Sequence, residues 1–252
     1  GGGMSLSLHG RTALVTGGAR GIGLELSRQL VARGCRIIVV GQSQSRLTAL
    51  EQAFPGAIVT RRADLASRAE VDCLVADLAR DHPGIDLLIN NAGVQVEMDL
   101  FALPPAQATA FARHEIATNL DSVVALTLGL LPVLARQERA AVVTITSGLA
   151  IAPKAASPVY GATKAAARSF TRALRYQCQR AAPHLQVSEA IMSLVATDMT
   201  EGRGSGKITP AQAAAAVLTG LERGQAEIWV GKAKLLRLVN RMSPGLAARL
   251  LR

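Results

Sequence analysis

The chain has 252 residues, of which 49% are hydrophobic and 18% are charged. This composition indicates a compact globular protein of one large or two small domains, and it excludes a disordered chain. No apolar run approaches the about 18 residues that a membrane-spanning helix requires, so we expect none.

The net charge of +10 is concentrated towards the C-terminal end. Residues 203–252 hold 9 basic and 2 acidic side chains, whereas the first 202 residues hold 19 and 16. Proteins that bind nucleic acid usually carry a basic stripe across the fold and aromatic side chains on which bases stack. Aromatic residues make up only 3% of this chain, so the sequence argues against a nucleic-acid partner.

The N-terminus and the cysteines indicate the cellular compartment of the protein. Gly1–Gly3 precede Met4 as a cloning remnant would, and no secretory signal follows. Cys35, Cys73 and Cys178 are an odd number without a CxxC pair, which is typical of buried free thiols in a reducing compartment. The four histidines lack the spacing of metal ligands. We therefore expect a cytoplasmic protein without a metal.

Along the chain, apolar runs rich in β-branched residues predict strands at 13–16, 36–40, 57–60, 85–89, 141–145, 185–188 and 227–230. Helical periodicity predicts helices at 21–33, 43–53, 67–81, 105–137, 158–180 and 210–223. Gly34 is placed to cap the first helix, and Thr209-Pro210 to begin the last. The alternation favours the α/β class: a single-domain Rossmann fold with a doubly wound seven-stranded parallel sheet and helices on both faces.

The first predicted strand is followed by the glycine-rich sequence TGGARGIG at residues 16–23. Gly17, Gly21 and Gly23 would let the backbone turn tightly and approach a pyrophosphate at the N-terminus of the next helix. The spacing is one residue looser than GxGxxG, and an ordinary tight turn is the alternative reading. Because the loop joins a predicted strand to a predicted helix, we expect a dinucleotide site that Arg20 and Ile22 also line.

The end of the second predicted strand indicates which dinucleotide binds. NAD-binding proteins place Asp or Glu there to bind the ribose 2′-hydroxyl, but residues 26–50 contain no acidic side chain. Gln42 and Ser43 follow that strand instead. Their donors, with Arg20, would hold a 2′-phosphate that a carboxylate would repel. The sequence therefore favours NADP(H).

Tyr160 and Lys164 are four residues apart on a predicted helix, which puts them on one face. A tyrosine that works near neutral pH needs its pKa lowered by about 3 units, or roughly 4 kcal/mol. A unit charge at about 4 Å supplies about 4 kcal/mol at an effective dielectric constant of about 20, so we expect Lys164 to lower the pKa of Tyr160. By itself this spacing is more often an ordinary helix surface. The position of the pair after Ser147, at the end of the fifth predicted strand, favours a catalytic role instead.

Together these motifs resemble the short-chain dehydrogenase/reductase family over roughly residues 10–200. Besides the glycine loop, the resemblance includes Asp64-Leu65, NNAG at residues 90–93, the helix asparagine Asn119, and the trio Ser147, Tyr160 and Lys164. Segments 147–176, 197–200, 202–207 and 231–236 are similar to the DltE-like bacterial branch.

The resemblance implies roles for individual residues. Asn119, Ser147, Tyr160 and Lys164 would be catalytic, with Asn119 holding a water that links Lys164 to solvent. Cofactor contacts would come from Tyr160, Lys164 and a further set: Asp64, Leu65, Asn91, Ala92, Gly93, Val195 and Thr197. Relatives associate through long helices such as those predicted at 105–137 and 158–180, which implies a homodimer or homotetramer.

The sequence departs from the family at one wall of the expected site. Met192 and Ser193 stand where the family usually has Pro-Gly, which puts the geometry beside the nicotinamide in doubt. Substrate contacts are expected from the carboxyl edge of the sheet, at residues 95–98, 149–153, 192 and 199–207. Most of these residues are apolar or small, which favours an uncharged carbonyl or alcohol.

The domain organisation follows from these assignments. Residues 4–231 form the predicted NADP-binding and catalytic domain, and residues 232–252 form a basic amphipathic tail. Packing of the tail on the domain or on a dimer partner is favoured, with contact to an anionic membrane as the alternative.

The predicted function is that of an NADP-dependent oxidoreductase that moves hydride between the nicotinamide and a carbonyl or alcohol, with tyrosine as general acid and base. The alternative is a silent NADP-binding sensor or scaffold protein. The sensor would have no need of an acid–base group.

Overall fold

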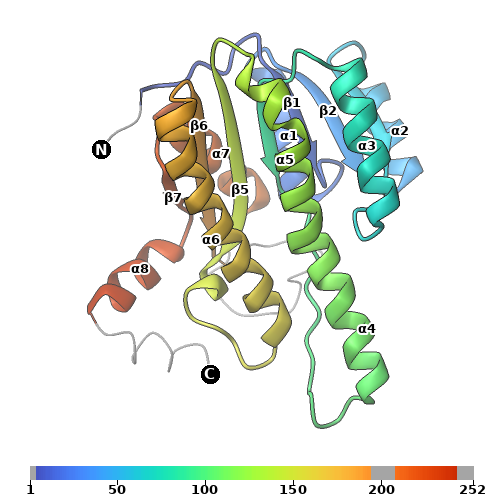
Figure 1. Ribbon diagram of the computed structural model, residues 1–252, viewed down its shortest axis with the longest axis vertical. Helices are drawn as coiled ribbons and strands as arrows, with labels where there is room; N and C mark the ends of the chain where they lie inside the picture. Colours follow the sequence, from blue (N-terminus) through green and yellow to red (C-terminus); the bar gives the residue numbers. More distant parts are fainter. Residues whose placement is uncertain (1–3, 194–207, 243–252) are drawn as a thin grey trace.

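The computed structural model describes residues 4–193 and 208–242, and its centre is one parallel sheet of seven strands (Figure 1). The strands are β1 (Thr12–Thr16), β2 (Arg36–Gly41), β3 (Ile58–Arg62), β4 (Leu87–Asn90), β5 (Ala140–Ser147), β6 (Leu185–Met192) and β7 (Glu227–Trp229). They lie in the order β3-β2-β1-β4-β5-β6-β7. The order reverses between β1 and β4, and ligands of such sheets bind outside the carboxyl ends of the strands at that point.

Helices cover both faces of the sheet. They are α1 (Gly21–Ala32), α2 (Gln44–Ala53), α3 (Arg68–Asp81), α4 (Pro105–Ile116), α5 (Ser122–Ala135), α6 (Pro158–Ala181), α7 (Pro210–Glu222) and α8 (Ala233–Met242). Apolar side chains of α1, α2 and α7 pack on one face, and those of α3, α5 and α6 pack on the other. The predicted doubly wound Rossmann fold is therefore confirmed.

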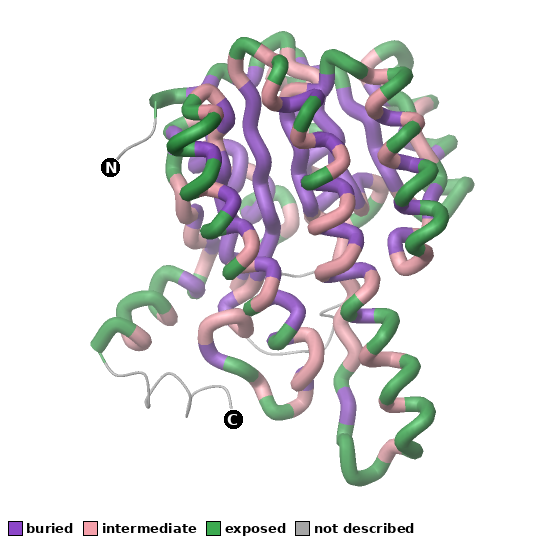
Figure 2. The backbone as a smooth tube through the Cα atoms, in the orientation of Figure 1, coloured by how far each residue is buried: buried purple, intermediate pink, exposed green. Residues whose placement is uncertain are grey.

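The strands are buried on both sides, which explains their nearly continuous apolar sequences (Figure 2). In β1, Ala13 and Val15 belong to the core under α1 and α7, whereas Leu14 belongs to the core under α3 and α5. Successive side chains of a strand point to opposite faces, so each face needs apolar residues of its own.

The predicted helix ends are present. Gly34 follows α1 with a φ of +84°, a conformation that favours glycine. Thr209 caps α7: its side chain accepts a hydrogen bond from the backbone N–H of Gln212, whose own side chain accepts one from the backbone N–H of Thr209. Pro210 occupies the first turn, where its missing N–H costs nothing.

The helix predicted at 105–137 is divided by a π-helical turn (η1, Ala117–Asp121) into α4 and α5. By length and composition the stretch Pro105–Ala135, with a mean hydropathy of 1.6, is sufficient to cross a membrane. That result differs from the expectation drawn from the sequence. Leu126, Leu130 and Leu134 are buried in the core beside α3, so packing accounts for part of this apolar character.

The cysteines follow the sequence expectation only in part. All three are free, and Cys35 and Cys178 are buried. Cys73, however, is exposed, because it lies on the outer side of α3. The expectation of three buried thiols is therefore wrong for Cys73.

The tail begins with α8, which lies beside the carboxyl end of β7 (Figure 1). Leu236 of α8 reaches Gly148, where an added Cβ would be 2.9 Å from its Cδ2 atom. Ala233 is buried, whereas Leu235, Leu238 and Met242 are exposed. The tail beyond residue 242 lies outside the described residues.

Candidate active site

The glycine loop joins β1 to α1 and requires glycine for steric reasons. Gly17 and Gly21 have φ angles of +63° and +54°. A Cβ on Gly17 would be 3.1 Å from the Cα of Ala92, and one on Gly23 would collide with the carbonyl oxygen of Gly17. Asn91 fixes the loop from the other side: its Nδ2 donates to the carbonyl oxygens of Thr16 (3.1 Å) and Gly17 (3.3 Å).

The first turn of α1 presents unpaired backbone N–H groups. Arg20 is the N-cap residue, its side chain makes no capping hydrogen bond, and the first turn contains no acidic residue. Arg20 is exposed, whereas the half-buried Ile22 packs against the core. The positive end of the helix dipole, free N–H groups and a guanidinium make this turn suited to a phosphate.

Of the residues predicted to select NADP, Gln42 and Ser43 lie at the carboxyl end of β2, beside Asp64 after β3, whereas Arg20 lies in the glycine loop after β1. Gln42 and Ser43 are exposed, and Gln42 donates through Nε2 to Asp64 Oδ1 at 2.7 Å. Asp64 Oδ1 also accepts from the backbone N–H of Ala66 at 2.9 Å, and Leu65 beside it is buried. Ser43 caps α2 by accepting from the backbone N–H of Arg46.

The NNAG segment after β4 connects the glycine loop to the other half of the site. The backbone N–H groups of Asn91 and Ala92 both donate to Thr16 Oγ1 at 3.0 Å. A Cβ on Gly93 would be 3.3 Å from Lys164 Nζ and 3.4 Å from Asn119 Oδ1. Glycine at this position therefore lets the backbone pass close to both side chains.

Ser147, Tyr160 and Lys164 come together from β5 and α6. The Ser147 side chain hydrogen-bonds the Tyr160 hydroxyl and accepts from the backbone N–H of Leu149 at 3.1 Å. Lys164 is buried, and its Nζ lies 5.6 Å from the centroid of the Tyr160 ring. That Nζ donates to the carbonyl oxygen of Ile145 at 3.1 Å.

The pKa of Tyr160 moves opposite to the sequence expectation. Burial is the largest influence and raises this pKa to about 12. The hydrogen bond with Ser147 lowers the pKa, and the negative charge of Glu115 raises it. Burial also lowers the pKa of Lys164 to about 8, since a buried ammonium loses its hydration. The expectation that Lys164 lowers the pKa of Tyr160 is not met in the protein without its cofactor, where burial is the largest influence on this phenol. The joint effect of Lys164 and an oxidised nicotinamide on this pKa stays a prediction.

Asn119 lies in the π-helical turn with its side chain fully occupied. Its Oδ1 accepts from the backbone N–H of Val94 at 2.8 Å, and its Nδ2 donates to the carbonyl oxygen of Val94 at 2.8 Å. Nδ2 also lies 3.2 Å from Thr163 Oγ1, on the helix that carries Tyr160 and Lys164. Asn119 thus ties the segment after β4 to α6, and its role towards a water stays a prediction.

Glu115 is a component of the site that the sequence analysis missed. It is fully buried, its Oε2 accepts from the backbone N–H of Val96 at 3.2 Å, and its Oε1 has no hydrogen-bond partner among the described residues. Burial raises the pKa of this carboxyl above its usual value. A signal was available, because Glu115 precedes Asn119 by four residues on one helix and so shares its face.

The substrate wall is only partly described. Met192, the last residue of β6, is buried and lies opposite Ser147 in the β5–β6 register, so this departure from the family borders the site. Gln95 donates to Ser157 Oγ at 3.0 Å, at the start of α6. Val195, Thr197 and the segment 199–207 lie outside the described residues.

Comparison with known proteins identifies the family. Residues 11–207 match the family model described as short chain dehydrogenase. DltE of Bacillus subtilis (strain 168), named an uncharacterized oxidoreductase, is 38% identical over 172 residues, which are 68% of this chain and 67% of DltE. YdfG of Salmonella typhi, named an NADP-dependent 3-hydroxy acid dehydrogenase, is 33% identical over 164 residues, or 64% of each chain.

A solved structure shows the same likeness over nearly the whole chain. The crystal structure of a short chain dehydrogenase from Burkholderia cenocepacia J2315 in complex with NADP has a TM-score of 0.85 at 25% identity, covering 98% of this chain and 100% of that one. The chain therefore belongs to the short-chain dehydrogenase/reductase family. Its similarity to DltE agrees with the branch expected from the sequence.

Proposed function

We propose that the protein is an NADP(H)-dependent oxidoreductase that reduces a carbonyl compound to an alcohol, with Tyr160 as the proton donor. The observation that carries this proposal is the convergence of Ser147, Tyr160 and Lys164 beside the glycine loop at one edge of the sheet. A sensor that binds a dinucleotide without turnover would not require a phenol hydrogen-bonded to Ser147.

The residues present fit a dinucleotide phosphate. Gly17 and Gly21 adopt backbone conformations that favour glycine, and the first turn of α1 offers free N–H groups. The end of β2 carries Gln42 and Ser43 rather than a carboxylate, and Arg20 is exposed in the glycine loop after β1. These donors suit a 2′-phosphate. The names of the Salmonella relative and the Burkholderia structure, both referring to NADP, support the same cofactor.

When bound, the cofactor supplies or accepts hydride at its nicotinamide. The chain supplies the proton: the Tyr160 hydroxyl donates it to the substrate oxygen, which Ser147 orients by a hydrogen bond. Lys164, anchored on the Ile145 carbonyl, places a cationic group beside the phenol. Asn119 acts as a positioning residue, because it joins the Val94 backbone to Thr163.

The raised pKa of Tyr160 describes the protein before a cofactor binds. With a pKa of about 12, the phenol is protonated at neutral pH and able to donate its proton. The same phenol accepts the proton when the reaction runs towards alcohol oxidation, so this pKa favours neither direction.

The substrate proposed is an uncharged carbonyl compound. Apolar or small residues supply most of the described parts of the expected wall, among them Leu149, Ala152 and Met192. Glu115 contributes a buried carboxyl near Tyr160, which disfavours an anionic substrate at that place.

Self-association is a further part of the proposal. Large apolar side chains are exposed on α4, α5 and α6, at Ile116, Leu128 and Tyr176, and in the turn before α4, at Phe101. Exposed apolar surface of this kind is typical of protein–protein contacts. Sedimentation that finds a dimer or tetramer supports this inference, and a monomer at all concentrations contradicts it.

A panel of aldehydes, ketones and alcohols with NADPH and NADH tests the function. The purified protein should oxidise NADPH with at least one uncharged carbonyl compound and prefer NADPH over NADH. Preference for NADH would refute the cofactor assignment. Tight NADPH binding without turnover across a broad panel would favour the sensor.

A further inference from the structure

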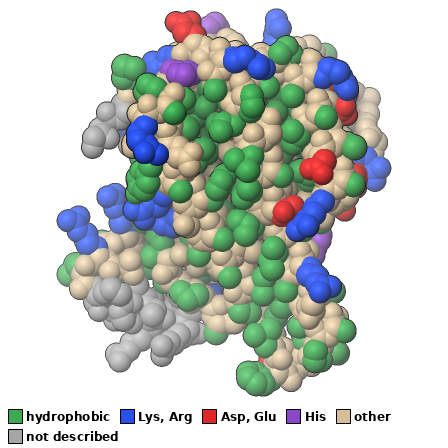
Figure 3. All heavy atoms as spheres, viewed as in Figure 1, with side chains coloured by type: hydrophobic (Ala, Val, Ile, Leu, Met, Phe, Trp, Pro, Cys, Tyr) green, Lys and Arg blue, Asp and Glu red, His purple; other side chains and the backbone are tan. Residues whose placement is uncertain are grey.

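A pocket with a volume of ≈ 380 Å³ lies between α6, β7 and α8, away from the glycine loop. Its walls combine four arginines with an aromatic ring and a small apolar patch. The side chains that matter here are Arg168, Arg172, Trp229, Arg237 and Arg241. Lys and Arg side chains gather over α8 in Figure 3.

The pocket adjoins the candidate active site but lies away from Tyr160. Tyr160 and Arg168 lie eight residues apart on α6, which corresponds to about 12 Å along the helix axis. The pocket meets the site at Ala150 and Ile151, which line the pocket and belong to the segment 149–153 expected to contact the substrate.

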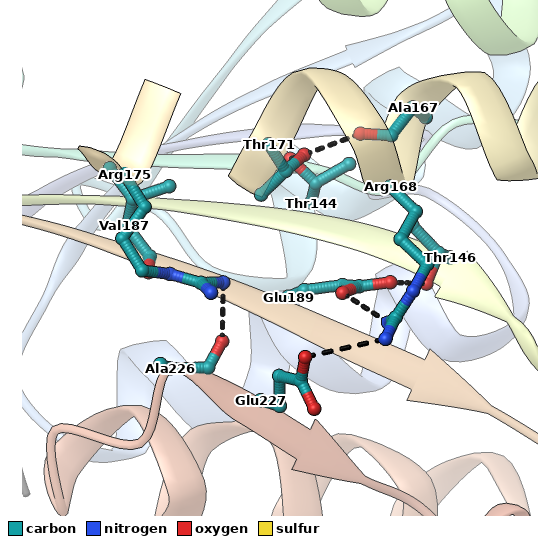
Figure 4. Close-up of polar contacts among 10 residues, drawn as sticks. All are labelled: Thr144, Thr146, Ala167, Arg168, Thr171, Arg175, Val187, Glu189, Ala226 and Glu227. Atoms are coloured by element: carbon teal, nitrogen blue, oxygen red, sulfur yellow. Dashed lines mark hydrogen bonds and ion pairs between the residues drawn. The ribbon is translucent and has the colours of Figure 1, made fainter. Parts of the chain in front are cut away.

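Arg168 lines this pocket, and two carboxylates hold its guanidinium group (Figure 4). Its Nη1 pairs with Glu189 Oε2 at 2.6 Å and its Nη2 with Glu227 Oε1 at 3.3 Å. Glu189 is completely buried and also accepts from Thr146 Oγ1 at 2.6 Å. Two carboxylates therefore already neutralise this arginine and fix its position.

The other three guanidinium groups have no carboxylate partner among the described residues. Arg172 comes from α6, and Arg237 and Arg241 come from α8, where they are one turn apart and exposed. Arg237 and Arg168 lie over the Trp229 ring at 5.4 and 5.8 Å from its centroid. In the part of the chain that the structure describes, the pocket therefore holds four guanidinium groups and only two carboxylates, those paired with Arg168, so its net charge is positive.

Trp229 contributes its aromatic ring to the same wall. The wall thus offers the positive charge and N–H donors of the guanidinium groups to a ligand, together with this ring and the apolar Ala150 and Ile151.

We propose that this pocket binds a phosphate-class oxyanion, such as the phosphate group of a small soluble metabolite. Guanidinium groups bind phosphate oxygens through paired N–H donors, and the excess positive charge suits a dianion. The apolar wall formed by Ala150, Ile151 and Trp229 would contact the organic part of the ligand.

The protein provides its own probe, because Trp229 is its single tryptophan. Titration of the full chain with inorganic pyrophosphate should change the tryptophan fluorescence saturably. The double variant Arg172→Gln/Arg241→Gln should weaken this response about tenfold or more, the scale of one lost charge-assisted hydrogen bond. Arg180→Gln/Arg223→Gln, an equal charge change at exposed positions outside the pocket, should bind as the wild type does.

Three results would overturn the proposal. One is the absence of any saturable change with pyrophosphate. Another is an equal loss in both double variants, which would indicate general charge screening. The third is a response to vesicles of anionic phospholipid but not to pyrophosphate, which would assign the arginines to a membrane surface. Circular dichroism of each variant checks that it is folded.

Discussion

When the protein carries no cofactor, the phenol of Tyr160 should stay protonated at pH values at which a free tyrosine ionises. Burial raises its pKa to about 12, whereas free tyrosine has a pKa of about 10. The difference of about 2 units corresponds to about 3 kcal/mol against the phenolate. If Lys164 controlled the phenol as its helical spacing suggests, the pKa would lie near 7 instead.

The chain allows a direct measurement, because Tyr160 and Tyr176 are its only tyrosines. In a Tyr176→Phe background, near-ultraviolet absorbance of tyrosinate reports Tyr160 alone. At about pH 10 a free phenol is half ionised, whereas a phenol of pKa about 12 is only about 1% ionised. We therefore expect almost no tyrosinate signal under these conditions.

Two controls make the result decisive. The variant Tyr160→Phe/Tyr176→Phe gives the baseline, and far-ultraviolet circular dichroism at the same pH shows that the chain is folded. Complete ionisation of Tyr160 in the folded protein would refute the conclusion that burial raises the pKa of this phenol. Half ionisation in the folded protein would equally refute the burial of the hydroxyl.

Three further substitutions test separate parts of the account. Gln42→Asp places a carboxylate beside the expected 2′-phosphate. It should raise the KM for NADPH at least about tenfold relative to the KM for NADH. Glu115→Gln removes the negative charge that raises the pKa of Tyr160, so the alkaline midpoint of that phenol should move to lower pH. Glu189→Leu leaves Arg168 without its buried partner and should lower the free energy of unfolding in urea by about 3 kcal/mol.

Each of these expectations has a clear opposite. Unchanged selectivity between NADPH and NADH in the Gln42→Asp variant would show that the 2′-phosphate is bound by another group. A midpoint that rises in the Glu115 variant would mean that the carboxyl stabilises the phenolate. For Glu189, the double variant with Arg168→Met should recover part of the lost stability. Equal losses in the single and double variants would contradict a specific ion pair.

The backbone of the site could be predicted from the sequence because local rules determine it. Gly17 and Gly21 occupy conformations that favour glycine, so their identity reveals the loop. Tyr160 and Lys164 meet because residues four apart share a helix face. Parallel strands bring Ser147 to the same edge of the sheet as the glycine loop.

The electrostatics of the site could not be predicted in this way. The pKa of Tyr160 depends on how deeply α6 packs and on Glu115, which comes from α4. The partners of Asn119 lie in the segment after β4 and on α6, and no local pattern connects them. The pocket at Trp229 likewise requires Arg168 of α6 and Arg237 of α8 to meet across β7.

The central claim is that Tyr160 transfers the proton during NADPH-dependent carbonyl reduction. The most direct measurement compares NADPH oxidation by the wild type and by Tyr160→Phe, with a carbonyl compound that the wild type reduces. The account predicts a loss of at least about a hundredfold in turnover, the usual contribution of an acid–base group, with NADPH binding retained. Near-normal turnover in the folded Tyr160→Phe variant would contradict it.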